Sequence, residues 1–173
     1  MQITILIGGI NLIDINYDKY RHNLTLKTKS YTHHYDSTSN PLLSPNKEYV
    51  AFISPFEWEC HGYVYLMNIA SGKVEDVPLK LDNDLTVKEL VWKNNNTLLL
   101  LIGSVWGTIN VGGDLYSYNI SKKKLKLLKR FEKRIQIKNI HITGEHTLLL
   151  SGIKYNDDIF NEFDQYDIEY TMK

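Results

Sequence analysis

The chain has 173 residues, enough for one domain with a substantial buried core. Twenty basic and twenty acidic residues leave a formal charge of zero, which excludes a global field favouring nucleic acid or an anionic membrane. The single cysteine, Cys60, excludes an intrachain disulfide, and no apolar run approaches the roughly 18 residues of a membrane span.

The first quarter of the chain predicts three strands and a loop. Residues 2–7 form an apolar run that stops at Gly8-Gly9, a turn signal, and residues 10–16 alternate as a second strand. Residues 22–29 alternate more weakly. Residues 31–40 are polar and aromatic without a clear period, and this predicts a loop long enough to carry function.

The rest of the chain predicts short strands separated by turns. The apolar run 97–102 indicates a strand covered on both faces. No segment keeps an apolar period of 3.6, so we expect little or no helix. The further strands are expected at residues 49–53, 63–69, 73–79, 86–92, 114–120, 124–130, 135–142, 147–151 and 163–168.

A repeat organises these strands. Residues 113–120, Gly-Asp-Leu-Tyr-Ser-Tyr-Asn-Ile, repeat the pattern of residues 62–69, Gly-Tyr-Val-Tyr-Leu-Met-Asn-Ile, about 50 residues earlier. With the strands of each unit labelled A to D, the chain predicts four units, the first lacking strand A and the last lacking strand D. Strand C is expected to end on an Asn or Asp, whose side chain closes a turn rather than binding a ligand; these residues are Asn16, Asn68, Asn119 and Asp167.

The segment Ser44-Pro45-Asn46-Lys47 before an apolar strand, together with Asp114-Leu115-Tyr116, resembles the blade signature of TolB-like and WD-repeat-like β-propellers. Residues 54–59 and 106–113 resemble an uncharacterised family of small, mostly Gram-positive bacterial propeller-like proteins. The resemblance implies an all-β, compact propeller-like array forming a single domain over residues 1–173. Asn46 stands where Asp is usual and no Gly follows it. About 14 strands are predicted where a four-blade ring needs about 16, so either the ring is incomplete or its ends pair with each other or with a second chain. Unpaired edges invite association, which makes a homodimer plausible.

The propeller resemblance also implies that the B–C and D–A loops emerge on one face used for binding. Aromatic side chains surrounded by charge suit such a surface. The candidate binding residues are Tyr31, His33, His34, Tyr35, Phe56, Glu57, Trp58, His61, Trp106, Asn110, Tyr155 and Asp158. The competing interpretation is structural, with the Phe and Trp side chains plugging a central channel or capping blades.

Metal and catalytic signatures are weak. His33-His34 and Cys60-His61 lack the paired spacing of zinc sites, and neighbours in extended chain point apart. No nucleophile elbow, phosphate loop or dinucleotide fingerprint occurs. We therefore predict no metal, no cofactor and no catalytic residue.

The sequence thus favours a non-enzymatic binding or scaffold module that presents loop aromatics to a protein or peptide. The alternative is a small-molecule binder or hydrolase at the channel mouth, with acid–base candidates His33, His34, Glu57, Glu59 and Asp158. We expect no nucleic-acid partner, and a cytoplasmic location unless a secretory leader has been removed from the chain.

Overall fold

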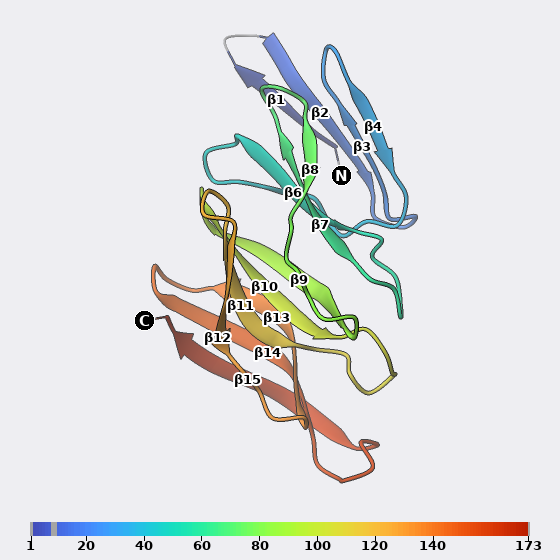
Figure 1. Ribbon diagram of the computed structural model, residues 1–173, viewed down its shortest axis with the longest axis vertical. Coiled ribbons are helices and arrows are strands. Elements are labelled where there is room, and N and C mark those ends of the chain that lie inside the picture. The colour runs from blue at the N-terminus through green and yellow to red at the C-terminus, as the bar shows by residue number, and fades with distance from the viewer. Residues whose placement is uncertain (1, 8–9, 173) are drawn as a thin grey trace. The chain divides into compact units, whose positions relative to one another are not determined.

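Alternating apolar and polar residues produce fifteen β-strands and, in residues 2–7 and 10–172, which the structure describes, no helix. The structure is a computed structural model (Figure 1). It divides into two units, Met1–Pro78 and Leu79–Lys173, which are treated separately below. The predicted turn at residues 8 and 9 lies outside the described residues.

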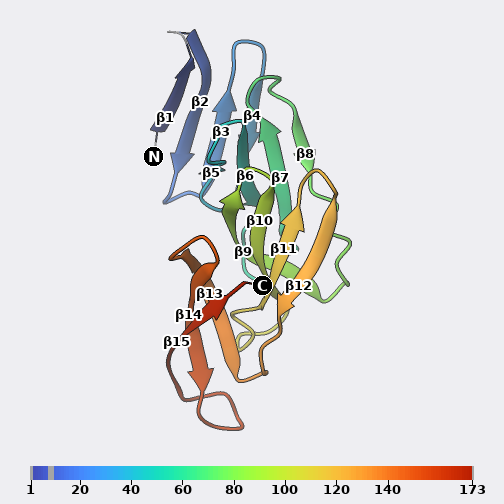
Figure 2. The ribbon, with the colours of Figure 1, turned by 90° about the vertical axis from the view of Figure 1, so that its left-hand side faces the viewer.

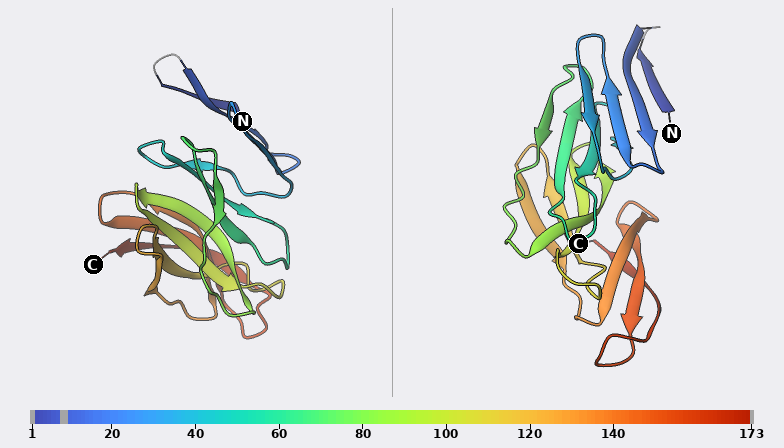
Figure 3. Two further views of the ribbon diagram at one scale, coloured as in Figure 1. Left: turned by 45° about the horizontal axis from the view of Figure 1, so that its top comes forward. Right: turned by 90° about the vertical axis from the view of Figure 1, so that its right-hand side faces the viewer.

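The first unit contains two antiparallel sheets, each with its strands in chain order. Figure 2 shows the four strands of the first sheet side by side, and they are the darker and lighter blue strands in the right panel of Figure 3. The first sheet comprises β1 (Gln2–Ile7), β2 (Ile10–Asp18), β3 (Asn23–Lys27) and β4 (Thr32–Tyr35). The second comprises β5 (Leu42–Leu43), β6 (Tyr49–Ser54), β7 (Tyr63–Asn68) and β8 (Val74–Asp76).

The second unit also contains two antiparallel sheets. The four-stranded sheet comprises β9 (Leu85–Asn94), β10 (Thr97–Ser104), β11 (Asp114–Asn119) and β12 (Lys124–Lys129). The three-stranded sheet comprises β13 (Ile135–Ile142), β14 (Thr147–Tyr155) and β15 (Phe163–Thr171). The all-β class, the four antiparallel sheets and the missing last strand of the fourth sheet are therefore confirmed.

The first sheet corrects one part of the predicted repeat. Residues 32–35, expected to be loop, form β4, so this sheet has four strands and does not lack its first one. Thr28 explains the error. Its Oγ1 accepts the N–H of Tyr31 at 3.0 Å, as Asn68 Oδ1 accepts that of Ser71 at 2.9 Å, so Thr28 closes β3 in the way that Asn68 closes the third strand of the second sheet.

Only two of the four predicted turn-closing residues have that role. Asn68 and Asn119 end strands, and Asn119 Oδ1 accepts the N–H of Lys122 at 2.8 Å. Asn16 instead lies within β2, opposite Gln2 and Thr25. Asp167 lies within β15. The sequence pattern misplaced both residues, because an Asn or Asp inside a strand cannot be told from one that ends a strand by sequence alone.

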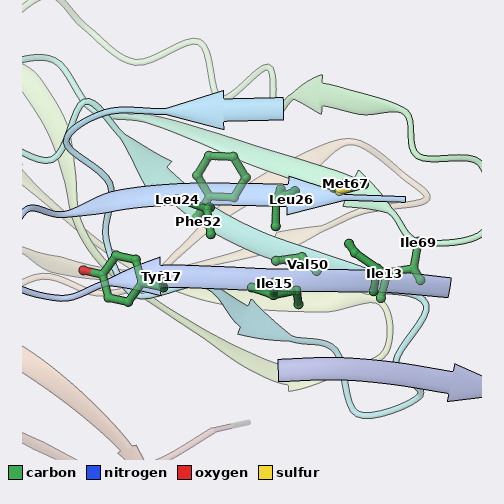
Figure 4. Packing of buried hydrophobic residues seen from close by; sticks show 9 residues of the cluster. All are labelled: Ile13, Ile15, Tyr17, Leu24, Leu26, Val50, Phe52, Met67 and Ile69. Atoms are coloured by element: carbon green, nitrogen blue, oxygen red, sulfur yellow. The ribbon is translucent and has the colours of Figure 1, made fainter. Parts of the chain in front are cut away.

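The core of the first unit lies between its two sheets. Apolar side chains from alternate positions of β2 and β3 meet those of β6 and β7, as Figure 4 shows. Phe52 is fully buried and packs against Tyr35, with ring centroids 4.8 Å apart, and against Tyr65 at 5.5 Å. The cluster comprises Ile13, Ile15, Tyr17, Leu24, Leu26, Val50, Phe52, Met67 and Ile69.

The second unit has an equivalent core between its own two sheets. The five consecutive residues from Leu98 to Ile102 are all buried, so the prediction that this strand is covered on both faces is confirmed. The core cluster comprises Leu99, Leu101, Leu115, Ile137, Ile140, Leu148, Leu150 and Met172.

Candidate loop sites

In the first unit, the β6–β7 loop is anchored to the connection between β4 and β5. The N–H of Phe56 donates to Ser37 O at 2.7 Å, and the Ser54 hydroxyl donates to Asp36 O at 3.3 Å. The same connection is bonded to the β2–β3 turn through the N–H of Thr38, which donates to His22 O at 2.7 Å. The predicted meeting of B–C and D–A loops at one end is thus seen within this unit.

This anchored loop carries exposed aromatic side chains. Trp58 is 58% exposed and Phe56 38%, and Tyr63, the first residue of β7, is 56% exposed. Glu57 is also exposed, whereas His61 is half-buried. Burial of Phe56 and Trp58 in a core is therefore not what the structure shows.

The candidates from residues 31–35 lie on or beside β4, the outer strand of the first sheet, rather than in a loop. His33 Nε2 lies 3.0 Å from Gly72 O in the β7–β8 turn, and its ring stacks on Tyr31 at 6.3 Å. His34 points to the opposite face, where Nδ1 lies 3.0 Å from Thr25 Oγ1. Tyr35 packs on the core, and burial, with a smaller contribution from Tyr65, raises its pKa.

In the second unit, three connections meet at one end. The buried Tyr155 donates its hydroxyl to Ile109 O in the β10–β11 loop at 3.0 Å. Its N–H donates to Arg134 O at 2.8 Å, and the Arg134 guanidinium pairs with Asp158 in the β14–β15 loop. Tyr155 and Asp158, predicted as binding residues, therefore serve first to join loops.

Trp106 lies on a turn in which both its backbone N–H and its carbonyl are hydrogen-bonded. Its N–H donates to Ser104 Oγ at 3.2 Å, and its carbonyl accepts the Asn110 side-chain amide at 3.1 Å. The next residue, Gly107, adopts a φ of 91°, a left-handed conformation that glycine reaches without strain. Lys88 Nζ donates to Asn110 O at 2.9 Å. The indole is left 52% exposed on this fixed turn.

Sequence reasoning missed several exposed apolar side chains at these loop ends. Their signal was present, because each is a large apolar residue inside or next to a turn segment, but single residues of this kind are common on surfaces. They are Tyr20 at 85% exposure, Ile159 at 79%, Tyr63 at 56% and Phe163 at 56%.

Two ionisable residues in β9 were also missed. Loss of hydration lowers the pKa of Lys88 and raises that of Glu89 to about 7. Glu89 pairs across the sheet with Leu101, so its side chain lies on the face that carries the second unit's core.

The described side chains do not form a metal centre: no group of three or more His, Cys, Asp or Glu residues is arranged to hold an ion. The described residues also contain no apolar helix of membrane-spanning length. Within the first unit, the acid–base candidates are separated. His33 contacts the turn after β7, whereas Glu57 and Glu59 belong to the loop before it, and six strand residues span about 20 Å.

Comparison with known protein families identifies the family of this chain. Residues 15–172 match the family described as a domain of unknown function, DUF4652. The chain belongs to this family. No similarity was found to any curated protein. The predicted resemblance to an uncharacterised family is therefore confirmed.

Solved structures support the propeller-like fold. A "putative conserved lipoprotein" from Clostridium novyi matches at a TM-score of 0.72 and 23% identity, covering 80% of this chain and 89% of that one. TolB from Acinetobacter baumannii matches at 0.52 and 10% identity, covering 92% and 38%. An acylaminoacyl peptidase from Pyrococcus horikoshii matches at 0.52 and 12%, covering 93% and 30%. The chain thus spans well under half of the two longer proteins, and the likeness is one of fold.

One prediction is overturned by these comparisons. The first structure is described as a lipoprotein, and lipoproteins are anchored to membranes outside the cytoplasm. The expected cytoplasmic location is therefore wrong. Nothing in the composition signalled this, because a neutral chain with one cysteine suits either compartment.

Proposed function

We propose that the chain is a non-enzymatic binding module that presents loop aromatics to a protein or peptide partner. The observation that carries this proposal is the state of Trp58 and Trp106. Each is more than half exposed, yet each sits on a loop whose backbone is hydrogen-bonded to neighbouring segments of its own unit. Tryptophan is the residue most enriched among the energetic anchors of protein interfaces.

The fixed backbone strengthens this argument. A binding loop that is ordered beforehand loses little conformational entropy when a partner arrives, so more of the contact energy remains as affinity. The Phe56 N–H bond to Ser37 and the two bonds around Trp106 provide that order.

A hydrolase at the same loops has less support. His33 is hydrogen-bonded to Gly72 O and His34 to Thr25 Oγ1, on opposite faces of β4. Asp158 is ion-paired with Arg134. A general base must lie within hydrogen-bond reach of the group that it serves, and His33 contacts the turn after β7, whereas Glu57 and Glu59 belong to the loop before β7.

The test is selection of ligands from a phage-displayed library of random peptides, followed by anisotropy titration of each selected peptide. The variant Phe56→Ala/Trp58→Ala and the variant Trp106→Ala are compared with wild type. We expect one of them to weaken binding at least tenfold with little change in Tm, since the removed side chains are exposed. Ile142→Ala, which removes an exposed apolar side chain at the end of β13, away from these loops, is the matched control. Equal affinity in all proteins would reject the proposal.

We also propose that this module works outside the cytoplasm. The support is the fold shared with the Clostridium novyi lipoprotein over most of both chains. The test is fractionation of the native cells combined with protease treatment of intact cells. Protection of the protein and its recovery in the soluble cytoplasmic fraction would reject this location.

A further inference from the structure

The three-stranded sheet of the second unit has a long edge at β15, its outermost strand in Figures 1 and 2. Nine consecutive residues of β15 pair with β14 without a bulge. Among the described residues, β15 pairs with no other strand. A long, regular edge of this kind is a template for a further strand.

The backbone groups available at this edge follow from the register. The N–H of Asn156 donates to Glu162 O, and that of Met172 donates to His146 O. Both pairs continue the β14–β15 register, so even-numbered residues of β15 direct their N–H and C=O groups toward β14. The odd-numbered residues therefore direct theirs outward, and these are Phe163, Gln165, Asp167, Glu169 and Thr171.

The side chains of β15 give the edge a definite chemistry. Tyr166, Ile168 and Tyr170 alternate along the face that packs on the core, and each is half-buried. Asp164, Asp167 and Glu169 are exposed, and the strand Phe163–Thr171 contains no lysine or arginine. The edge is therefore acidic beside an apolar face.

We propose that β15 binds an extended protein segment of alternating basic and apolar residues, which becomes the fourth strand of this sheet. The outward N–H and C=O groups pair with the segment's backbone. Its apolar residues continue the face of Tyr166 and Ile168. Its basic residues lie beside Asp167 and Glu169, where opposite charges across a strand pair stabilise it.

The chain itself shows what such a fourth strand looks like. In the four-stranded sheet of the same unit, the outer strand β12 has the sequence Lys-Leu-Lys-Leu-Leu-Lys. Leu125 lies opposite Tyr118, while Lys126 lies opposite Ser117 and is exposed. A strand of this composition therefore fits the outer position of a sheet in this fold.

Pairing of β15 with β15 of a second copy is disfavoured by the same charges. Antiparallel pairing centred on Asp167 would place the two Asp167 carboxylates opposite each other, and like charges in that position are destabilising. Charge complementarity thus selects a basic partner strand over an identical acidic one.

The test uses a labelled peptide with the sequence of residues 122–131 and the full chain at low salt. Gln165→Pro places a proline ring where an outward N–H stood, without changing charge or removing a β14–β15 bond, and Gln165→Ala is its control. We expect Gln165→Pro to weaken binding at least tenfold and Gln165→Ala to leave it nearly unchanged. The double variant Asp167→Asn/Glu169→Gln should weaken binding as well and reduce its salt dependence.

The outcomes separate this site from the loop site. Binding that survives Phe56→Ala/Trp58→Ala and Trp106→Ala but is lost in Gln165→Pro supports the edge. If Gln165→Pro does not fold, the double charge variant still decides. Equal binding of a peptide whose lysines are replaced by glutamate would overturn the proposal. Self-association abolished by Gln165→Pro, without peptide binding, would also overturn it, because the occupant would then be a second copy.

Discussion

Glu89 provides a sharp test of the packing in the second unit. It lies opposite Leu101, a fully buried core residue, and burial raises the pKa of its carboxyl from 4.5 to about 7. Above pH 7 the folded chain therefore holds a poorly hydrated carboxylate. The replacement Glu89→Gln keeps the shape of the side chain and removes the charge.

The direction in which pH changes the free energy of unfolding follows from the protonation of Glu89 in the folded and in the unfolded chain. Below pH 4.5 the carboxyl is protonated in both folded and unfolded chains, so its ionisation has no effect on stability. Between pH 4.5 and about 7 only the unfolded chain loses the proton, and the free energy of unfolding falls as pH rises. Taken at face value, a pKa shift from 4.5 to about 7 corresponds to a total fall of about 3 kcal/mol. Because the side chain is only partly buried, we expect ~1–2 kcal/mol.

Urea unfolding of wild type and Glu89→Gln at pH 5 and pH 8 measures this difference. The variant should be close to wild type at pH 5 and more stable by ~1–2 kcal/mol at pH 8. Glu132→Gln, which changes an exposed carboxylate of the same unit, should show no such pH dependence. A Glu89→Gln effect that is the same at both pH values would show that Glu89 is hydrated in the folded chain and would refute the reasoning.

Two further predictions concern stability. Asn119→Ala removes the side-chain oxygen that accepts the Lys122 N–H and should cost about 1 kcal/mol, whereas Asn16→Ala, within β2, should cost less; equal effects in urea unfolding would contradict the turn assignment. Phe52→Ala empties the centre of the first unit's core and should cost about 3–5 kcal/mol, against less than ~1 kcal/mol for the exposed Phe163→Ala. Similar losses of Tm in these two variants would show that Phe52 is not a core residue.

The sequence was a good guide to strands whose pattern depends on local burial. The apolar run from Leu98 to Ile102 and the alternation in β11 follow directly from which faces are covered. It failed at β4, where His33, His34 and Tyr35 look like loop residues. They form a strand because Tyr35 packs on Phe52 and His33 meets the carbonyl of Gly72, contacts that join positions far apart in the chain.

For the same reason, the sequence predicted the exposure of some candidate site residues but not the role of others. Exposure of Trp58 and Trp106 agrees with their place in non-repeated loops. The role of Tyr155 was hidden, because its hydroxyl bonds the backbone of Ile109, 46 residues earlier. Such a contact depends on how two loops approach each other, and no spacing in one sequence encodes it.

The two ends of the strands accordingly carry different constraints. At one end, Asn68, Asn119 and Thr28 each fold a side-chain oxygen back onto the following backbone, so these turns tolerate few residue types. At the other end, loops are held partly by backbone bonds, as at Phe56 and Ser37, and partly by scattered side chains such as Tyr155. Exposed side chains between those bonds, such as Trp58, can vary with little effect on the fold. Selection for a partner can therefore act on the tryptophan-bearing loops, while the repeated turns preserve the sheets that support them.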